Sequence, residues 1–421
     1  MGDINMKQPE LTEWIDEALK RAQPVILTDH EEKLADILID KAYELSSQNN
    51  KMLGRALAAA FDILVSAEYY KRVTNRGWCY CPNGEPSIIY PYTNTCPRCI
   101  LNKEFHYHPA NKPPSGQIGQ ATFRLLCVFL DRLFNRATKN LKILKGSEPI
   151  DMIIQDHSSN VILIAEVKAA PLLTLPLFVR SEKMTAVQDD AIIELQHSGV
   201  DNSSIHSSEF NIMLPVQHGE SWNYELIPLG SMGNTPELWA YDRLQMAFQT
   251  DKDLFNRYFD FWDKAFETYQ SAYITGDRTS SIYWLTNACG QPSPRPENWP
   301  LRSNGSGYES VSDAKTSVGM DRTDDIKKGI YQVLKLGAES KPLNRKYDVK
   351  TALISNIHAV RHYDEYLLSL QDVVWTLDEK GTAKKVGDLP DEKPIYNLFD
   401  GIISFTRNIA RDEWIKDVFN F

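Results

Sequence analysis

Three charged residues stand out because they border apolar runs that are typical of buried strands. Asp151 precedes the run "MIIQ", and Glu166 and Lys168 lie at the end of "VILIAEVK". The turn residues between the two runs, "HSSN" (157–160), predict an antiparallel hairpin. In that hairpin Asp151 faces Glu166, and Lys168, two residues further on, shares the face of Glu166. The sequence therefore predicts that two carboxylates and one ammonium group converge at one end of the hairpin.

Such a group of side chains suggests a metal-assisted reaction. Facing carboxylates repel each other and destabilise a hairpin unless a cation lies between them. Mg2+ suits this position because it binds through one or two carboxylates and keeps several waters. A lysine beside the metal can orient and help deprotonate a bound water, which indicates phosphodiester hydrolysis. The alternative is an ordinary solvated hairpin edge, since Glu-x-Lys is common at strand ends and edge charges oppose aggregation.

A second Asp-x-Lys pair lies in "SVSDAKTSVGMDR", at Asp313 and Lys315. No long apolar strand precedes it, so we interpret it as a polar loop that faces phosphates beside the active site, with a catalytic pair as the alternative. Gln332, in the helix that follows, is a candidate to face the metal, and its alternative role is that of a solvated or core-satisfying residue.

Four cysteines form a C-x-C pair and a C-x-x-C pair separated by 14 residues. Two close thiolate pairs are typical of tetrahedral zinc, and "CPRC" is a turn that aims two sulfurs at one ion. Four sulfurs leave no position for a catalytic water, so we expect a structural Zn2+. His106 and His108 are alternative ligands, although surface or aromatic packing suits them better, and free thiols remain the other interpretation. The predicted ligands are Cys79, Cys81, Cys96 and Cys99.

Length and composition limit the class of protein. A chain of 421 residues is longer than one hydrophobic core usually serves, which predicts two or three domains. The net charge of −10 argues against nonspecific binding of nucleic acid over the whole surface, but it allows a local basic cleft. No apolar run approaches the ~18 residues of a membrane span. The start "MGDINMKQPELTEW" lacks a secretory signal pattern, so we expect a cytoplasmic protein without disulfides.

Periodicity divides the chain into segments of different character. Helical spacing covers 31–74, a cysteine-rich and Pro-rich segment follows, and a further apolar helix that includes Cys127 as a core residue precedes the hairpin. Beyond the hairpin, "FNIMLPVQ", "YELIPLG" and "SSIYWLTNA" are strand-like, "DLFNRYFDFWDKAFETYQSAY" is helical, "TDDIKKGIYQVLKLG" predicts a helix that stops at Gly337, and "KTALISNI" predicts a buried strand. The expected organisation is an N-terminal helical lobe (1–76), a zinc-binding knuckle (77–112), a core split between 113–172 and 311–421, and an insertion (173–310).

The hairpin and its flanking elements resemble the PD-(D/E)XK nuclease superfamily. "PID" ends in Asp151, and "EVK" carries Glu166 and Lys168. In that family a helix, an antiparallel three-stranded meander, a second helix and a further strand form the catalytic core. This sequence supplies "GQATFRLLCVFLDRLF", the hairpin, "TDDIKKGIYQVLK" and "KTALISNI" in that order, over residues 115–172 and 312–358. The long insertion after the hairpin departs from the family pattern.

The resemblance implies an α/β (α+β) fold with a mixed central sheet flanked by helices. Asp151 and Glu166 would be metal ligands, and Lys168 would be the water-orienting base. The implied activity is that of a type II restriction enzyme, a Mg2+-dependent, site-specific endonuclease acting on double-stranded DNA, and we expect a homodimer because a two-fold dimer cuts both strands most simply. The absence of a G-x-x-x-x-G-K-[ST] motif favours a self-contained enzyme. The alternatives are a repair or phage-defence nuclease without fixed sequence and a zinc-ribbon DNA-binding protein with an inactive nuclease core.

The insertion is the expected sequence-reading region, because a catalytic core of this type holds only the phosphate and the metal. Arginine pairs with guanine, and asparagine or glutamine pairs with adenine, in the major groove. Polar residues on loops bounded by proline and glycine are therefore candidates, with an ordinary surface loop as the alternative for each. The candidates are Asn287, Gln291, Arg295, Arg302, Asn304 and Arg322.

Overall fold

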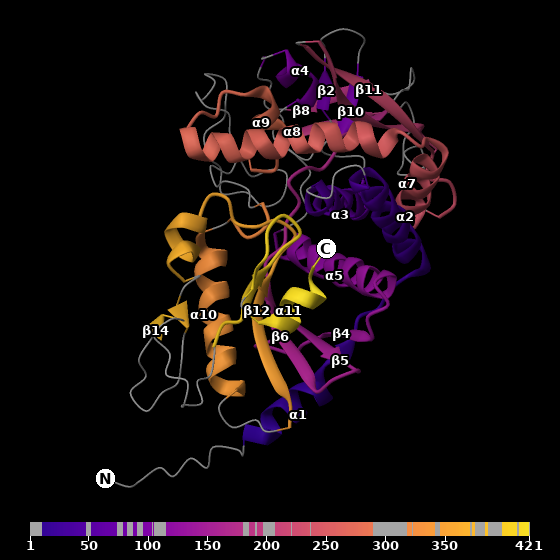
Figure 1. Ribbon diagram of the computed structural model, residues 1–421. Helices are drawn as coiled ribbons and strands as arrows, with labels where there is room; N and C mark the ends of the chain where they lie inside the picture. Colours follow the sequence, from indigo (N-terminus) through magenta and orange to yellow (C-terminus); the bar gives the residue numbers. More distant parts are fainter. Residues whose placement is uncertain are drawn as a thin grey trace. The chain divides into compact units, whose positions relative to one another are not determined.

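A computed structural model describes most of the chain, which forms two compact units. Unit 1 comprises residues 1–27, 127–169 and 320–421, and unit 2 comprises residues 28–126 and 170–319 (Figure 1). The described residues are 11–47, 52–73, 79–81, 87–90, 96–102, 104, 115–179, 185–189, 192–196, 207–219, 221–235, 237–288, 318–321, 323–341, 346–370, 373–374, 384–385, 398–410 and 412–420.

Unit 1 is built on a seven-stranded mixed sheet, which confirms the expected α/β class with a mixed central sheet. The strand order is β1-β4-β5-β6-β12-β15-β16. Strands β4, β5 and β6 form an antiparallel meander, whereas β12 runs parallel to β6, and β15 runs parallel to β12. Every residue of β6 is buried, as expected of a central strand covered on both faces. The bounds are β1 (Gln23–Pro24), β4 (Leu141–Lys145), β5 (Met152–Asp156), β6 (Val161–Val167), β12 (Asp348–Ile354), β15 (Gly401–Ile403) and β16 (Ile409–Ala410).

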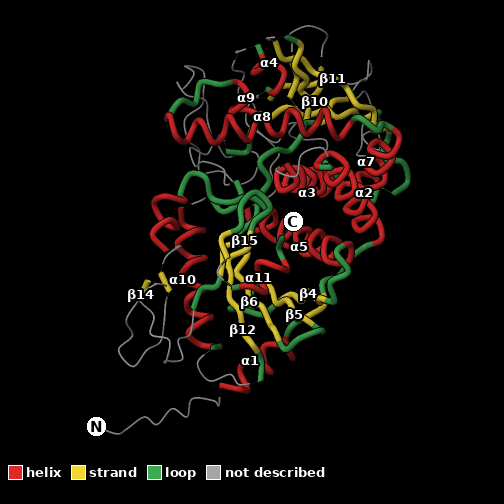
Figure 2. Tube along the Cα trace, viewed as in Figure 1, coloured by secondary structure: helices red, strands yellow, loops and turns green. Residues whose placement is uncertain are grey.

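Helices pack against this sheet on both faces (Figure 2). On one face, α10 (Thr323–Ser340) and α1 (Leu11–Arg21) bury Leu336 and Ile15 against Ile164 of β6. The C-terminal half of α5 (Ser115–Arg136) contacts the loop after β15. There the Phe129 and Phe405 rings meet edge-on, and their centroids are 5.3 Å apart. The chain order α5, hairpin β5–β6, α10, β12 is the order of elements that the sequence predicted, whereas β4, the first strand of the meander, was not predicted. Unit 1 also contains α11 (Glu413–Val418), the short helical turns η3 (Tyr363–Leu367) and η4 (Leu368–Leu370), and the strands β13 (Val373–Val374) and β14 (Lys384–Lys385).

Helix α10 does not stop at Gly337, so that prediction was wrong. The helix continues for three residues and ends at Ser340. A Cβ atom at position 337 would lie 2.3 Å from the carbonyl oxygen of Leu398, a distance that no side chain tolerates. This glycine therefore allows the helix to pass close to the Leu398 backbone rather than ending the helix.

Unit 2 combines helices with a five-stranded sheet of order β11-β10-β7-β3-β2. Segments from the expected knuckle, β2 and β3, pair in this sheet with β7 of the expected insertion, so these regions share one sheet. The predicted helices over 31–74 are α2 and α3, which pack against each other. The bounds are α2 (Asp29–Ser46), α3 (Leu53–Tyr70), α4 (Pro97–Leu101), α7 (Trp239–Thr250), α8 (Leu254–Thr275), α9 (Ser281–Leu285), β2 (Cys79–Cys81), β3 (Ser87–Tyr90), β7 (Leu177–Val179), β8 (Thr185–Asp189), β9 (Ile192–Gln196), β10 (Phe210–His218) and β11 (Ser221–Gly230).

The segment "SSIYWLTNA" was predicted as a strand and is instead the short helix α9. The Trp284 indole N–H donates to the carbonyl of Arg278 at 2.6 Å, and Thr286 Oγ1 donates to the carbonyl of Tyr283 at 2.7 Å. These local bonds close the helical turn at both ends. A short apolar run has no period that distinguishes a strand from a buried helical turn, which explains the error.

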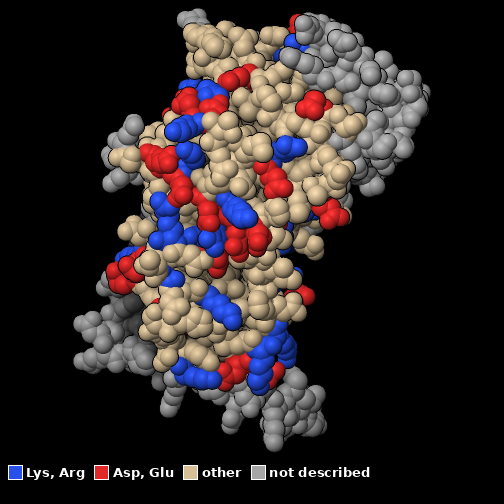
Figure 3. Space-filling model, turned by 90° about the vertical axis from the view of Figure 1, so that its right-hand side faces the viewer, with Lys and Arg blue, Asp and Glu red and all other residues tan. Residues whose placement is uncertain are grey.

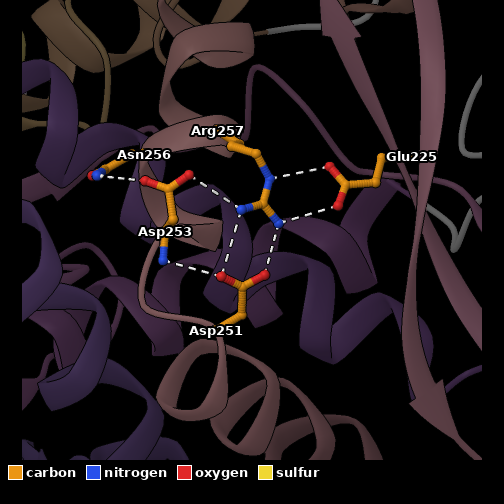
Figure 4. A network of polar contacts seen from close by, with 5 residues as sticks. All are labelled: Glu225, Asp251, Asp253, Asn256 and Arg257. Atoms are coloured by element: carbon orange, nitrogen blue, oxygen red, sulfur yellow. Dashed lines mark hydrogen bonds and ion pairs between the residues drawn. The ribbon is translucent and has the colours of Figure 1, made fainter.

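An arginine in α8 joins three carboxylates around the α7–α8 turn (Figure 4). Arg257 contacts Glu225 of β11 through Nε and Nη2, at 3.0 and 3.2 Å. Its Nη2 also lies 2.7 Å from Asp251 Oδ2, and Nη1 lies 3.3 Å from Asp253 Oδ2. The hydrogen bond to Asp251 is the main cause that raises the pKa of Arg257. The planar guanidinium fork fits carboxylates in pairs, so this residue fixes β11 to the helical turn.

Asp62, in the middle of α3, is fully buried and holds the chain that enters unit 2 after residue 169. Its Oδ2 atom accepts hydrogen bonds from the N–H groups of Leu172 and Leu173, at 2.9 and 3.0 Å, and from Trp262 Nε1 at 2.8 Å. Burial raises the pKa of Asp62 to about 8, and the three hydrogen bonds oppose this shift without cancelling it. The carboxyl group is therefore protonated at neutral pH in the folded chain.

We expect the Asp62→Asn protein to gain stability relative to the unmodified protein as pH rises from about 5 to 8. The folded chain holds the Asp62 proton in this window and the unfolded chain does not, so the unmodified protein loses about 1.4 kcal/mol of unfolding free energy per pH unit. Asparagine keeps the acceptor oxygen and does not titrate. Urea unfolding of both proteins at several pH values measures the difference, and parallel pH profiles would contradict the buried, protonated state.

The distribution of surface charge bears on nucleic-acid binding, and the hydropathy of the helices bears on membrane insertion. On the face drawn in Figure 3, acidic and basic side chains are interspersed rather than separated by sign. Within the described ranges, no helix has both the length and the apolar content needed to cross a membrane.

Candidate active site

The register of the β5–β6 hairpin brings Asp151 and Glu166 together as predicted. Met152 pairs with Ala165 and Ile153 with Ile164, on either side of the turn that follows Asp156. Asp151 comes one residue before β5, so the same register places it beside Glu166. The predicted hairpin register is therefore confirmed.

Asp151, Glu166 and Lys168 converge at the end of β6. Lys168 Nζ lies 2.5 Å from Glu166 Oε1, and the Val167 N–H donates to Asp151 Oδ2 at 2.9 Å. Glu166 is 7% exposed, whereas Asp151 and Lys168 are partly buried. The site is thus recessed but open on the side of Asp151 and Lys168.

Glu166 is a buried carboxylate with a second carboxylate, Asp151, beside it. Burial is the largest cause that raises the pKa of Glu166 to about 7, and the neighbouring Asp151 carboxylate raises it further. Lys168 acts in the opposite direction through its hydrogen bond and its charge. Two carboxylates and one ammonium leave a net negative charge when all three are ionised, which favours either a shared proton or a bound cation.

A tight turn before β5 holds Asp151 in place. The Gly146 N–H donates to the Asp151 carbonyl at 2.9 Å, and the Ile150 N–H donates to the Ser147 carbonyl at 2.9 Å. A Cβ atom at position 146 would lie 2.4 Å from the Ile150 carbonyl oxygen, so only glycine fits there. The position of the Asp151 carboxylate is therefore set by the backbone of the turn.

Helix α10 closes the site from one face of the sheet. A Cβ atom at Gly329 would lie 2.9 Å from a Leu353 methyl group and 3.8 Å from Lys168 Cγ, so the missing side chain lets the helix approach the lysine stem. Gln332, predicted to face a metal, lies near the site, and its Nε2 donates to the Pro149 carbonyl at 2.8 Å. Its amide nitrogen therefore supports the turn that carries Asp151.

The three parallel strands of unit 1 end at the same level as Lys168. Val167, Ile354 and Ile403 are paired across β6, β12 and β15. The ladder continues one step further, because the Lys168 N–H donates to the Ile354 carbonyl and the Ser355 N–H donates to the Ile403 carbonyl, both at 2.9 Å. Ligands of such sheets bind beyond the carboxyl ends of the strands. We call this row of strand ends the catalytic edge.

One predicted base-reading residue has a different role. Asn287 is buried, and its Nδ2 donates to the Pro171 carbonyl at 3.1 Å and to Thr174 Oγ1 at 3.2 Å. Its backbone N–H donates to the Leu172 carbonyl at 2.8 Å. Asn287 therefore holds the 171–174 segment, and its prediction as a DNA-reading side chain was wrong. The other candidates in this region lie outside the described residues: Gln291, Arg295, Arg302, Asn304, Asp313, Lys315 and Arg322.

The predicted zinc ligands belong to neighbouring elements of unit 2. In the β2–β3 register, Cys79 lies opposite Ile89. The side chain of Ile89 packs in one cluster with Cys96 and Cys99, both buried, at the start of α4. The structure describes β2 only by its backbone, and His106 and His108 lie outside the described residues. Among the side chains that are described, no group of three or more His, Cys, Asp or Glu is arranged to hold a metal.

Sequence patterns did not single out the residues that follow β15. Strand β15 has three residues, and the loop after it, "SFTRN", lacks a motif or a period. Arg407 lies in this loop, beyond the catalytic edge. Its connection with Lys168 becomes visible only in the sheet, where the parallel strands β6 and β15 end at the same level.

No protein-family model, no curated protein and no solved structure matches this chain.

Proposed function

We propose that this chain is a metal-dependent nuclease that hydrolyses phosphodiester bonds in double-stranded DNA at specific sites, in the manner of type II restriction enzymes. The observation that carries the proposal is the convergence of Asp151, Glu166 and Lys168 at the end of a buried strand. The resemblance of these residues to the PD-(D/E)XK pattern supports the same activity, and so does the order of α5, the meander, α10 and β12 around them.

The donor set suits Mg2+. The carboxylates of Asp151 and Glu166 offer hard oxygen ligands. Burial and, after it, the Asp151 charge raise the pKa of Glu166, and a divalent cation would favour the ionised carboxylate against both effects. Asp151 and Glu166 would hold the ion, which, when bound, stabilises negative charge on the phosphoryl oxygens.

The chain's own residues would position the reactants. Lys168 Nζ, held by Glu166, would orient the attacking water, and in its neutral amine form it would accept the proton that the water loses. Hydrolysis then joins the water oxygen to phosphorus as the bond from phosphorus to the leaving oxygen breaks, and the leaving oxygen gains a proton. The backbone turn at 146–151 keeps the Asp151 carboxylate in place during this exchange.

A digestion experiment tests the proposal. Mixed-sequence double-stranded DNA is incubated with the pure protein and Mg2+, and the new ends are sequenced. Cleavage at one short, two-fold symmetric sequence supports a restriction enzyme acting as a homodimer, which would act on its DNA in the cytoplasm. Cleavage without fixed sequence supports a repair or phage-defence nuclease. Binding without any cleavage supports the third candidate, a zinc-ribbon DNA-binding protein with an inactive core.

We also propose a structural Zn2+ bound by four cysteine sulfurs in unit 2. Two observations support the site: Cys79 lies opposite Ile89 in the β2–β3 register, and Ile89 packs in one cluster with the buried Cys96 and Cys99. Tetrahedral sulfur ligation fixes a small segment that has little core of its own. The ligands would be Cys79, Cys81, Cys96 and Cys99.

The zinc proposal predicts about one zinc per chain in protein purified without added zinc. Structural zinc contributes directly to folding free energy, so Cys96→Ser should lose the metal and lower the melting temperature. Cys127→Ala is the matched control, because Cys127 is buried in α5 and belongs to neither cysteine pair. Metal analysis of the three proteins is the measurement, and an unmodified protein without zinc would refute the site.

A further inference from the structure

Two cations lie over tyrosine rings where the chain leaves the catalytic edge. The Arg407 Cζ atom is 4.4 Å from the centroid of the Tyr363 ring, and its Nη2 donates to the Tyr363 hydroxyl at 3.2 Å. The Lys327 Nζ atom, near the start of α10, is 4.9 Å from the centroid of the Tyr366 ring. Both tyrosines belong to the short helix η3. We call the two cations and two tyrosines the η3 platform.

The backbone around this platform is held by a dense set of hydrogen bonds. The buried Asp321 carboxylate accepts from the N–H groups of residues 360–362, at 2.8 to 3.1 Å. In the loop after β15, the Ser404 N–H donates to Asn408 Oδ1 at 2.8 Å, and the Arg407 N–H donates to Ser404 Oγ at 3.2 Å. The Tyr363 ring is buried in the core cluster that contains residues of β12 and β15. The platform is therefore a fixed part of unit 1.

The charges of the platform point outward. Arg407 and Lys327 are exposed, and among the residues with described positions no carboxylate forms an ion pair with either. Two acids, Asp364 and Glu365, lie on the same turn. The Glu365 carboxylate approaches His362 Nδ1 at 3.3 Å. A hydrogen bond from Tyr366 is the main cause that lowers the pKa of Glu365, and the charge of Lys327 contributes to the same shift without forming an ion pair. The charge of Glu365 is thus partly engaged with the turn itself.

We propose that Arg407 and Lys327 bind the phosphate backbone of the nucleic acid on one side of the scissile bond. This inference rests on the proposed function. Neighbouring strands lie about 4.8 Å apart, so the end of β15 is roughly 10 Å from Lys168, which corresponds to about three base-pair steps along the axis of a DNA duplex.

Two physical properties favour a phosphate ligand at this place. A guanidinium group donates two parallel hydrogen bonds to phosphate oxygens, and it remains charged at any physiological pH. A side chain that already lies over an aromatic ring loses less conformational entropy when it binds. The platform therefore presents preordered cations next to the catalytic edge.

Salt-dependent DNA binding tests the platform. Binding is measured without divalent metal, so that no cleavage occurs, over a range of salt concentrations. Each phosphate contact contributes about one unit to the slope of log affinity against log salt, so Arg407→Ala should reduce the slope by about one and weaken binding roughly tenfold. Lys327→Ala should do the same, and Arg407→Glu should weaken binding more than Arg407→Ala.

Lys416→Ala is the matched control, because Lys416 is an exposed cation of unit 1 paired with Glu413 on α11. The platform is refuted if Arg407→Ala and Lys327→Ala behave like this control, or if the unmodified protein binds no nucleic acid. The proposed function is judged separately, by cleavage with Mg2+. An unmodified protein that cleaves DNA while the platform variants bind it normally refutes only the platform.

Discussion

The Lys168→Ala protein is expected to lose DNA cleavage in Mg2+ by at least a hundredfold while it still binds DNA. Lys168 is the cation of the three convergent side chains, and positioned groups of this kind contribute about 10²- to 10⁴-fold to proton-transfer steps. Removing the ammonium also leaves Glu166 beside Asp151 without its 2.5 Å partner. Single-turnover cleavage of a labelled duplex is the measurement.

Isosteric variants separate charge from shape at the same site. Glu166→Gln and Asp151→Asn keep the side-chain volume and remove a metal-binding charge, so each is expected to lose cleavage as well. Lys142→Ala is the control, since Lys142 is an exposed lysine of β4 in the same sheet. If Lys168→Ala cleaves at the rate of the unmodified protein, the catalytic assignment fails.

The Asp400→Asn protein is expected to unfold with about 3–5 kcal/mol less free energy than the unmodified protein. Asp400 forms a buried ion pair with Lys341, at the end of α10, and its Oδ2 accepts the N–H of Thr351 in β12 at 2.7 Å. Burial lowers the pKa of Lys341 and raises that of Asp400, while the charge of each partner opposes these shifts. Asparagine keeps the hydrogen bond from Thr351 and leaves a buried ammonium without its counter-charge.

A double variant distinguishes the ion pair from general damage to the core. Buried pairs replaced on both sides are often nearly neutral, so Lys341→Met combined with Asp400→Asn should recover most of the lost stability. Chemical denaturation of the single and double variants measures the coupling. Additive losses would show that the two residues do not act as a pair.

The hairpin was predictable because its information is local. The turn residues after Asp156 set the centre of the hairpin, and that centre decides which residues of the two apolar runs lie opposite each other. The pairing of Asp151 with Glu166 followed from that register alone. The position of Lys168 followed from the two-residue period of a strand.

The limits of prediction came from contacts between residues far apart in sequence. Gly337 has the residue type of a helix end, but the close approach of the Leu398 backbone explains it instead. Asn287 has the residue type of a base reader, but the carbonyl of Pro171 and the hydroxyl of Thr174 occupy its amide. In both cases the tertiary partner decided the role, and no local pattern contains that partner.

The parallel pairing of β6 with β12 has a consequence for synthesis of the chain. All of unit 2 after residue 169 separates these two strands, so β12 emerges from the ribosome roughly 10–40 s after β6 at usual rates of translation. During that time the "VILIAEV" strand has an unpaired edge of the kind that promotes aggregation. We therefore expect the yield of native protein to depend on chaperones or on slow expression at low temperature, even though the finished sheet buries this strand completely.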